Sequence, residues 1–203
     1  MTGATRVLVA TTNQGKVREL AAILAGLPVE LVGLGDLDGA PEVEETGATF
    51  MANALLKARA YAAWSGLAAL ADDSGLEVDA LGGAPGVYSA RYAGPGASDA
   101  DNLAKLLGAI AAVPAAERTA RFRCAAVLAD PGGRTWEAEA AWEGRLLERP
   151  RGDGGFGYDP VFVPDGWDRT SAEVDAATKN AASHRAMAFA ALRPAVEAWA
   201  AGA

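Results

Sequence analysis

The sequence predicts an α/β or mixed α+β protein built on an extended β-sheet of mixed strand direction. The chain opens with a strand, a loop and a helix, because the apolar run Arg6–Thr11 leads into helical spacing of apolar residues over Lys16–Gly26. Farther along, Thr119–Leu128 and Arg134–Trp142 flank the turn sequence Asp130–Gly133, which predicts two long strands of a hairpin. An α/β opening combined with a long hairpin indicates the mixed sheet.

The other elements follow from apolar runs bounded by turn residues and from apolar residues at helical spacing. The remaining expected strands are Val29–Val32, Leu67–Ala71 and Val161–Val163. The remaining expected helices are about Thr49–Trp64, Ser98–Ala112 and Ser183–Ala201. Ser98 with Asp101 resembles a capping box with Asp in place of Glu, and Pro194 is expected to kink or restart the last helix. Leu81–Gly86 and Arg151–Gly157 are expected as glycine-rich loops.

Length and composition indicate a single domain over residues 1–203, in two closely joined lobes at most. The chain has 203 residues, is 51% hydrophobic and carries a formal net charge of -8. This acidic balance disfavours a nucleic-acid polymer as partner, because phosphate backbones are held by runs of Lys and Arg. The single cysteine, Cys124, excludes a disulfide framework and zinc ligation by paired cysteines, and we expect it in the core.

The sequence also predicts the cellular compartment of the protein. No stretch approaches the ~18 uninterrupted apolar residues of a membrane-spanning helix, so no membrane partner is expected. Residues 1–10 lack a charged start followed by a long apolar core, so a secretory signal is not expected either. These observations predict a cytoplasmic protein in a reducing compartment.

The first candidate ligand segment is Thr11–Lys16, with the sequence TTNQGK. A loop between strand and helix that ends on a lysine offers backbone N–H groups, a helix N-terminus and a cation to phosphate. It is not a P-loop, because Ala10 replaces the first Gly of that motif and Val17 its Mg²⁺-binding hydroxyl. The segment is either a phosphate site or an ordinary turn with Lys16 solvated. A cation at a helix N-terminus opposes the helix dipole, which favours an anion between them.

Adjacent acidic residues form the second candidate. Asp72 and Asp73 follow the apolar run Leu67–Ala71, so we expect them at the carboxyl end of a strand, where open α/β sheets bind ligands. Their mutual repulsion is tolerated best beside a divalent cation or a cationic partner. The acidic cluster Glu42–Glu45 could add a Mg²⁺ ligand or could be a solvated turn.

The third candidate combines the loop Gly155–Pro160 with Lys179 and the segment Ser183–Arg185. An aromatic ring between glycines on an open loop is a natural stacking platform for a base, and Asp159 could accept a hydrogen bond from a ring N–H. His184 on its own is more typical of a helix cap or a partly buried residue than of a catalyst.

Lysine is rare in this chain and gathers in these segments. The 18 basic residues comprise 14 Arg and 4 Lys, and lysine is the compact point charge that suits phosphate oxygens. Lys16, Lys57 and Lys179 lie in or beside the candidate segments, whereas Lys105 lies in an amphipathic helix outside them. A few focused cations with a carboxylate pair predict Mg²⁺ and a small polyphosphate.

The same segments form a series of motifs in order along nearly the whole chain. They are TTNQGK at Thr11–Lys16, Glu45-Thr46-Gly47, Asn53-Ala54, Lys57-Ala58, ADDSG at Ala71–Gly75, LGGAPGVYSARY at Leu81–Tyr92, FGYDP at Phe156–Pro160 and KNAASHR at Lys179–Arg185. This series resembles the inosine triphosphate pyrophosphatase family, the dITP/XTP diphosphatases. Two positions depart from the commonest pattern, Thr12 in place of Gly and Ala52 in place of Glu.

The resemblance implies a homodimeric, Mg²⁺-dependent enzyme with an elongated mixed sheet, flanking helices and two lobes around a nucleotide cleft. Such an enzyme hydrolyses non-standard purine nucleoside triphosphates (ITP, dITP, XTP) to the monophosphate and pyrophosphate. It thereby removes deaminated purines from the nucleotide pool.

The resemblance also implies a role for each matching residue. The triphosphate would be held by Thr11, Thr12, Asn13, Gln14, Gly15 and Lys16, with added charge from Lys57. Asp73 would be the proton acceptor and, with Glu45, a metal ligand, and Ser74 would contact the substrate. The base would be contacted by Phe156, Gly157, Tyr158 and Asp159, and its oxo group would be read by His184 and Arg185. Lys179 would contact the substrate.

We therefore expect Asp73 to take a proton from an attacking water while Lys16, Lys57 and the metal stabilise the leaving pyrophosphate. Two alternatives stay open. The enzyme could act on other modified nucleotides, or the chain could be a nucleotide sensor without turnover.

Overall fold

The computed structural model describes residues 5–202, so residues 1–4 of the segment considered for a signal lie outside the described part. Six strands form one sheet in the order β2-β1-β3-β4-β5-β6. Strand β1 (Thr5–Val9) pairs in parallel with β2 (Val29–Gly33) and β3 (Ala68–Val78). Strand β5 (Thr135–Leu146) follows β4 (Thr119–Ala129) and pairs antiparallel with β6 (Phe162–Pro164). The predicted mixed sheet is therefore confirmed.

Five α-helices flank this sheet over the described residues: α1 (Gln14–Ile23), α2 (Phe50–Ser65), α3 (Asp99–Ala109), α4 (Ala176–Ala182) and α5 (His184–Ala201). The predicted capping box is confirmed, because the Ser98 and Asp101 side chains each accept from the other's backbone N–H. The short helix α4 was not predicted. Ser183, with extended backbone, separates it from α5. Helix α5 runs through Pro194, so a restart at that residue is wrong.

The chain divides into two compact units, and strands β3, β4 and β5 contribute residues to both. The first unit contains the chain up to Asp73, Cys124–Ala140 and the chain from Arg185 onward. The second contains Ser74–Arg123 and Ala141–His184. None of the helices in the described part is long and apolar enough to cross a membrane.

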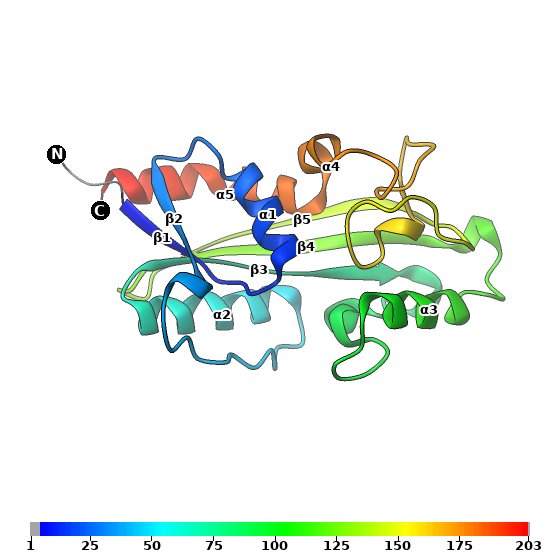
Figure 1. Cartoon of the computed structure of the whole chain (residues 1–203), viewed down its shortest axis with the longest axis horizontal. Helices are drawn as coiled ribbons and strands as arrows, with labels where there is room; N and C mark the ends of the chain where they lie inside the picture. The colour runs from blue at the N-terminus through cyan, green and yellow to red at the C-terminus, as the bar shows by residue number, and fades with distance from the viewer. Residues whose placement is uncertain (1–4, 203) are drawn as a thin grey trace. The chain divides into compact units, whose positions relative to one another are not determined.

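In the first unit, α1 and α5 cover one face of the sheet and α2 covers the other (Figure 1). Leu20 of α1 and Phe189 of α5 pack with Ala68 and Leu70 of β3, and with the buried Cys124 of β4. Side chains alternate between the faces of a strand, so Ala69 and Ala71 point toward α2. The prediction that Cys124 is a core residue is confirmed.

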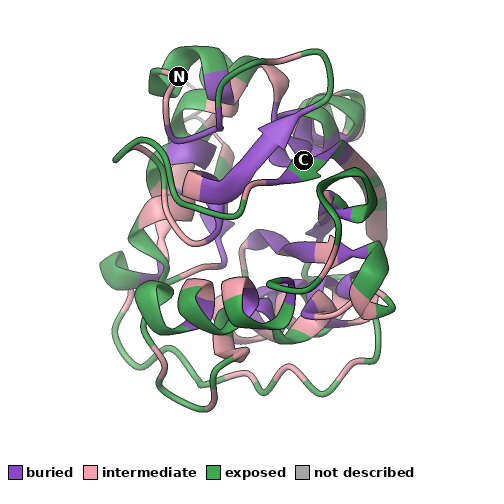
Figure 2. Cartoon of the chain, turned by 90° about the vertical axis from the view of Figure 1, so that its right-hand side faces the viewer, coloured by how far each residue is buried: buried purple, intermediate pink, exposed green. Residues whose placement is uncertain are grey.

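In the second unit, an aromatic cluster replaces this aliphatic packing. Phe162 of β6 lies 4.7 Å from Phe122 and 5.5 Å from Trp142 between ring centroids, in tilted or edge-on contacts. Helix α3 adds the buried Leu106 and Ile110 to this core. Figure 2 shows the buried residues concentrated in the strands, with the outer faces of the helices exposed.

Candidate functional site

The two adjacent aspartates lie inside a strand. Strand β3 continues through Asp72, Asp73, Ser74 and Gly75 to Val78, so the prediction that the pair sits at the carboxyl end of a strand is wrong. Ser74 and Gly75 favour turns in isolation, but β3 pairs with β4 as well as with β1, whose pairing ends at Leu70, and ladder pairing outweighs that local preference. The carboxylates thus stand within a continuous strand, just beyond the part that pairs with β1.

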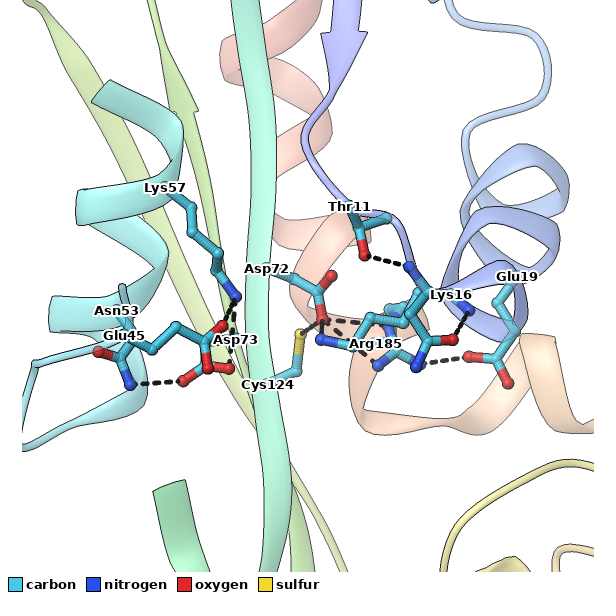
Figure 3. Close-up of polar contacts among 11 residues, drawn as sticks. Thr11, Lys16, Glu19, Glu45, Asn53, Lys57, Asp72, Asp73, Cys124 and Arg185 are labelled. Atoms are coloured by element: carbon cyan, nitrogen blue, oxygen red, sulfur yellow. Dashed lines mark hydrogen bonds and ion pairs between the residues drawn. The ribbon is translucent and has the colours of Figure 1, made fainter. Parts of the chain in front are cut away.

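The two carboxylates point to opposite faces of the sheet (Figure 3). Asp72 shares its face with Ala68 and Leu70, toward α1 and α5, whereas Asp73 faces α2. Each has its own lysine: Lys16 Nζ lies 2.9 Å from Asp72, and Lys57 Nζ lies 3.5 Å from Asp73. The expected cationic partner is therefore present for each carboxylate, and strand alternation also turns the two carboxylates away from each other.

On the α1 and α5 side, Asp72 is 1% exposed and lies in a cluster of charges. Arg185 Nε and Nη2 each lie 3.3 Å from Asp72 Oδ2, and Arg185 also pairs with Glu19 of α1. Burial opposes ionisation of Asp72, but Lys16 and Arg185 outweigh it, so the pKa of Asp72 lies well below its usual range. Asp72 is therefore an anion at neutral pH that pairs with two cations.

The Thr11–Lys16 segment is partly helical. Helix α1 begins at Gln14, so Gln14, Gly15 and Lys16 form its first turn, and the Asn13 side chain caps it by accepting from Lys16 N at 3.1 Å. The Thr11 hydroxyl accepts from Asn13 N at 3.2 Å, and Thr12 lies exposed between them. One interpretation of the sequence placed the Lys16 ammonium in solvent. In the structure it instead pairs with a carboxylate. The anion that balances it here is Asp72 of the same chain.

On the α2 side, Asp73 lies against three polar groups of the N-terminal part of the chain. Lys57 Nζ bonds Glu45 Oε1 at 2.6 Å and approaches Asp73 Oδ1, while Asn53 Nδ2 donates to Asp73 Oδ2 at 3.0 Å (Figure 3). Burial raises the pKa of Asp73, and the Lys57 and Lys16 ammonium groups only partly offset this. A carboxylate with a raised pKa on a rigid strand is suited to accept a proton.

The Lys57 ammonium is the electrostatic centre of this group. Burial lowers its pKa, but the attraction of Asp73, Asp72 and Glu45 outweighs that effect and raises it overall. Lys57 is therefore a fixed cation that holds Glu45 and Asp73 near one point.

The FGYDP residues, Lys179 and His184 lie in the second unit, whereas Arg185 belongs to the first. Asp159 is 2% exposed, and its carboxylate forms hydrogen bonds within the protein. It accepts from Phe156 N at 2.8 Å, Ser171 Oγ at 2.8 Å and Lys179 Nζ at 2.5 Å. Lys179 Nζ also lies 4.9 Å from the Phe156 ring centroid. Asp159 thus fixes both the backbone of the aromatic residue and the cation beneath its ring.

Other residues of the FGYDP loop differ in exposure. Tyr158 is buried, and its hydroxyl donates to the Ser89 carbonyl oxygen at 2.7 Å, so its ring belongs to the core of the second unit. Gly157 N donates to the Asp99 carboxylate at 2.9 Å. Phe156, Gly157 and Pro160 are partly exposed, so a ligand can reach these residues of the segment more readily than Tyr158 or Asp159.

His184 begins α5 and is 5% exposed. Its ring stacks on Phe122 at 4.8 Å between centroids, with 11° between the planes. His184 is thus buried more completely than the partly buried residue that the sequence alone favoured. Ser74, in β3, is half-buried.

Two site residues were missed by sequence reasoning, Asn53 and Glu19. Asn53 is completely buried although it is polar, and it lies one helical turn from Phe50 and from Lys57 on the inner side of α2. That spacing was the available signal, because a polar residue on a buried helix face needs a partner. Glu19 lies one turn after Lys16, but nothing in the sequence pairs it with Arg185.

We predict that Lys179→Arg lowers kcat/KM for nucleotide hydrolysis about tenfold or more, equivalent to at least about 1.4 kcal/mol. The Lys179 side chain fills the space between Asp159 and the Phe156 ring, and the larger planar guanidinium does not fit there without repacking. Lys16→Arg is expected to impair turnover for the same reason at Asp72. Steady-state kinetics of the purified variants measures both effects.

The matched control is Lys105→Arg, for which we expect unchanged kinetics. Lys105 donates to the Tyr92 carbonyl oxygen at 2.6 Å, and its Nζ lies 4.5 Å from the centroid of the Tyr92 ring. It is exposed, however, and arginine retains both the donor and the cation–π contact. Equal losses at Lys105 and Lys179 would mean that the arginine effect is not specific to the ligand segments.

Comparison with known proteins identifies the family. The model of the Ham1 family matches residues 7–195. The chain is 55% identical over 189 residues to a dITP/XTP pyrophosphatase of Geobacter sulfurreducens, covering 93% of this chain and 95% of that protein. It is 53% identical over 194 residues to a dITP/XTP pyrophosphatase of Streptomyces coelicolor, covering 95% and 97%.

Solved structures agree with this. A HAM1 protein from Coxiella burnetii superposes with a TM-score of 0.86 at 40% identity, covering 95% of this chain and 98% of that one. A nucleoside-triphosphatase, named as a dITP/XTP pyrophosphatase, from Mycobacterium abscessus gives 0.74 at 47% identity, covering 93% and 97%. These matches confirm the resemblance inferred from the motifs, and the chain belongs to the Ham1 family.

Proposed function

We propose that this chain is a nucleoside triphosphate pyrophosphatase that hydrolyses non-standard purine nucleotides (ITP, dITP, XTP) to the monophosphate and pyrophosphate. Relatives that share more than half of its residues carry the name dITP/XTP pyrophosphatase. The structural observation that carries the proposal is Asp73, a buried carboxylate of raised pKa held between Lys57 and Asn53 on a central strand. Such a group is built to accept a proton rather than to bind phosphate.

In this reaction, Asp73 takes a proton from the attacking water as the water oxygen bonds to phosphorus and the α–β anhydride breaks. Lys57 stabilises the negative charge that develops, since its raised pKa keeps it protonated. The first turn of α1 contributes Lys16 and backbone N–H groups to the triphosphate, through the helix N-terminus that Asn13 caps. The leaving pyrophosphate carries away the electron pair of the broken P–O bond.

We further propose that Glu45 and Asp73 hold Mg²⁺. Over residues 5–202 no group of three or more His, Cys, Asp or Glu side chains is placed to hold a metal. Mg²⁺ does not require one, because it usually takes one or two carboxylates and completes its shell with water and substrate phosphates. Glu45 and Asp73 approach the same Lys57 nitrogen at 2.6 and 3.5 Å, so this pair fits that demand. When bound, Mg²⁺ would polarise the phosphate and neutralise its charge.

For the base, we propose that the Phe156 ring stacks on the purine and that His184 and Arg185 contribute to recognition of its oxo group, while Lys179 contacts the substrate. Lys179 is oriented by Asp159, and His184 by its stacking on Phe122. In the described structure Arg185 is only 1% exposed and bonds Asp72 and Glu19, so its contribution acts through that cluster. Donors placed for a 6-oxo group are mismatched with the amine of adenine, which gives large discrimination.

The deciding experiment measures pyrophosphate release from dITP, XTP, ITP and ATP with Mg²⁺. We expect turnover of the first three and much slower turnover of ATP. Equal turnover of ATP and ITP would overturn the proposed specificity. A panel of other modified nucleotides separates the first alternative, an enzyme of different substrate preference.

The second alternative, a sensor without turnover, makes a different prediction. Tight ITP binding in a calorimeter without pyrophosphate release would support it. The burial of Asp73 and its raised pKa favour the enzyme over the sensor, because they suit the acceptance of a proton rather than the binding of phosphate.

The assembly and the location are proposed on the same grounds. The resemblance to the inosine triphosphate pyrophosphatases supports a homodimer, which sedimentation velocity would detect. A cytoplasmic location is consistent with a single buried, free cysteine and with a substrate of the nucleotide pool.

A further inference from the structure

Asn53 connects two parts of the Asp73 site. It lies in the first turn of α2 and has no solvent-exposed surface. Its Nδ2 donates to Asp73 Oδ2 at 3.0 Å, and its Oδ1 accepts from the backbone N–H of Gly47 at 2.7 Å (Figure 3 shows the contact with Asp73). A carboxylate only accepts and a backbone N–H only donates, so the bridge between them requires a side chain that does both at this length. An asparagine amide meets that requirement.

The loop on the other side of this bridge carries Glu45, two residues before Gly47. A Cβ atom on Gly47 would lie 2.7 Å from both Asn53 Oδ1 and the Ala52 Cβ, which is closer than real Cβ contacts come. The loop therefore packs directly on the start of α2, and glycine is required for that approach. The hydrogen bond and this steric fit independently place the loop against Asn53.

The two oxygens of Asp73 thus have separate partners. Oδ2 is held by Asn53, and Oδ1 faces Lys57, which also bonds Glu45. Asn53 and Lys57 lie four residues apart on the same side of α2, so one helix sets the orientation of both carboxylates.

We propose that Asn53 is a positioning residue for the reaction proposed above, on which this inference depends. Its amide fixes the rotation of the Asp73 carboxylate and, through Gly47, the distance of Glu45 from it. Asn53 itself touches neither water nor substrate. Its effect reaches the reaction through the proton acceptor and through the two carboxylates assigned to Mg²⁺.

The test separates the two halves of the bridge. Asn53→Asp keeps an acceptor for Gly47 N–H but turns a second oxygen toward Asp73, whereas Asn53→Ala removes both contacts. We expect each to lower kcat roughly 10–100-fold with little change in KM, and to raise the Mg²⁺ concentration needed for half-maximal rate. Wild-type kcat and Mg²⁺ dependence in Asn53→Asp would overturn the proposal. If that variant does not fold, Asn53→Ser is measured in its place, with the same expectation.

Asn102 provides a matched control. It is another buried asparagine near the start of a helix, and its amide also bridges a loop, accepting from Ala93 N at 2.7 Å and donating to the Ala90 carbonyl oxygen at 3.2 Å. We expect both Asn102→Ala and Asn53→Ala to lower the unfolding temperature. Only Asn102→Ala should leave kcat and the Mg²⁺ dependence unchanged. Equal kinetic losses in both variants would reduce Asn53 to a structural role.

A stability measurement keeps this inference separate from the proposed function. In a thermal double-mutant cycle of Asn53→Ala and Asp73→Ala, the double variant should lose less than the sum of the single losses. Additive losses would overturn the contact. If the wild type hydrolyses none of the four nucleotides, the proposed function fails, while the cycle still decides whether Asn53 orients Asp73.

Discussion

Asp73→Asn should lower kcat for dITP hydrolysis about 10²–10⁴-fold, the usual contribution of a positioned general base. The amide keeps the shape of the side chain and can still accept from Asn53, but it cannot take a proton from water. KM should change less than kcat, because Asp73 is proposed to act on the substrate only through the attacking water and through Mg²⁺, which is kept saturating. Pyrophosphate release under saturating Mg²⁺ measures this.

The same variant should not lower the unfolding temperature at neutral pH. Burial raises the pKa of Asp73, so the folded state favours its protonated form. The stability contributed by this group is present below its unfolded pKa, about 3.9, and is lost as the pH rises through its higher folded pKa. Asparagine does not titrate and avoids that loss. An undiminished kcat would contradict the assignment of Asp73 as the base, and a large fall in unfolding temperature would indicate a structural role instead.

Asp72→Asn should have the opposite profile, a loss of about 3–5 kcal/mol in the free energy of unfolding. The substitution leaves Lys16 and Arg185 buried with one carboxylate fewer to balance them. For a domain of this size, the loss corresponds to a fall of roughly 6–20 °C in unfolding temperature. Calorimetry or circular dichroism during heating measures the shift.

The pH dependence of this effect has a definite sign. Lys16 and Arg185 outweigh burial and lower the pKa of Asp72, so its contribution to stability is present above the unfolded pKa of about 3.9. It is lost as the pH falls toward the lower folded pKa. The difference between wild type and Asp72→Asn should therefore shrink in acid.

Asp79→Asn is the control for Asp72. Asp79 pairs with Arg121 at 2.9 Å, but its side chain is 45% exposed, and surface pairs contribute about 0–1 kcal/mol. If Asp72→Asn is at least as stable as Asp79→Asn, the buried charge cluster does not stabilise the fold.

Much of the fold could be predicted from local pattern. The hairpin strands, the long helix α2, the capping box of α3 and the core position of Cys124 all depend on periodicity, turn residues or composition, which neighbouring residues encode. The missed helix α4 is short, and the restart considered at Pro194 does not occur because the packed helix α5 continues through that residue.

In the candidate site, too, one part could be predicted from the sequence and another part could not. The sequence by itself determined which segments carry ligand chemistry, because motif order and the rarity of lysine are properties of the chain alone. Only the tertiary structure decided what Asp72 and Asp73 do. Ladder pairing extended β3 through them, and strand alternation turned one toward Lys16 and Arg185 and the other toward Lys57 and Asn53. These partners lie 16 to 113 residues away in sequence, so no local pattern could supply them.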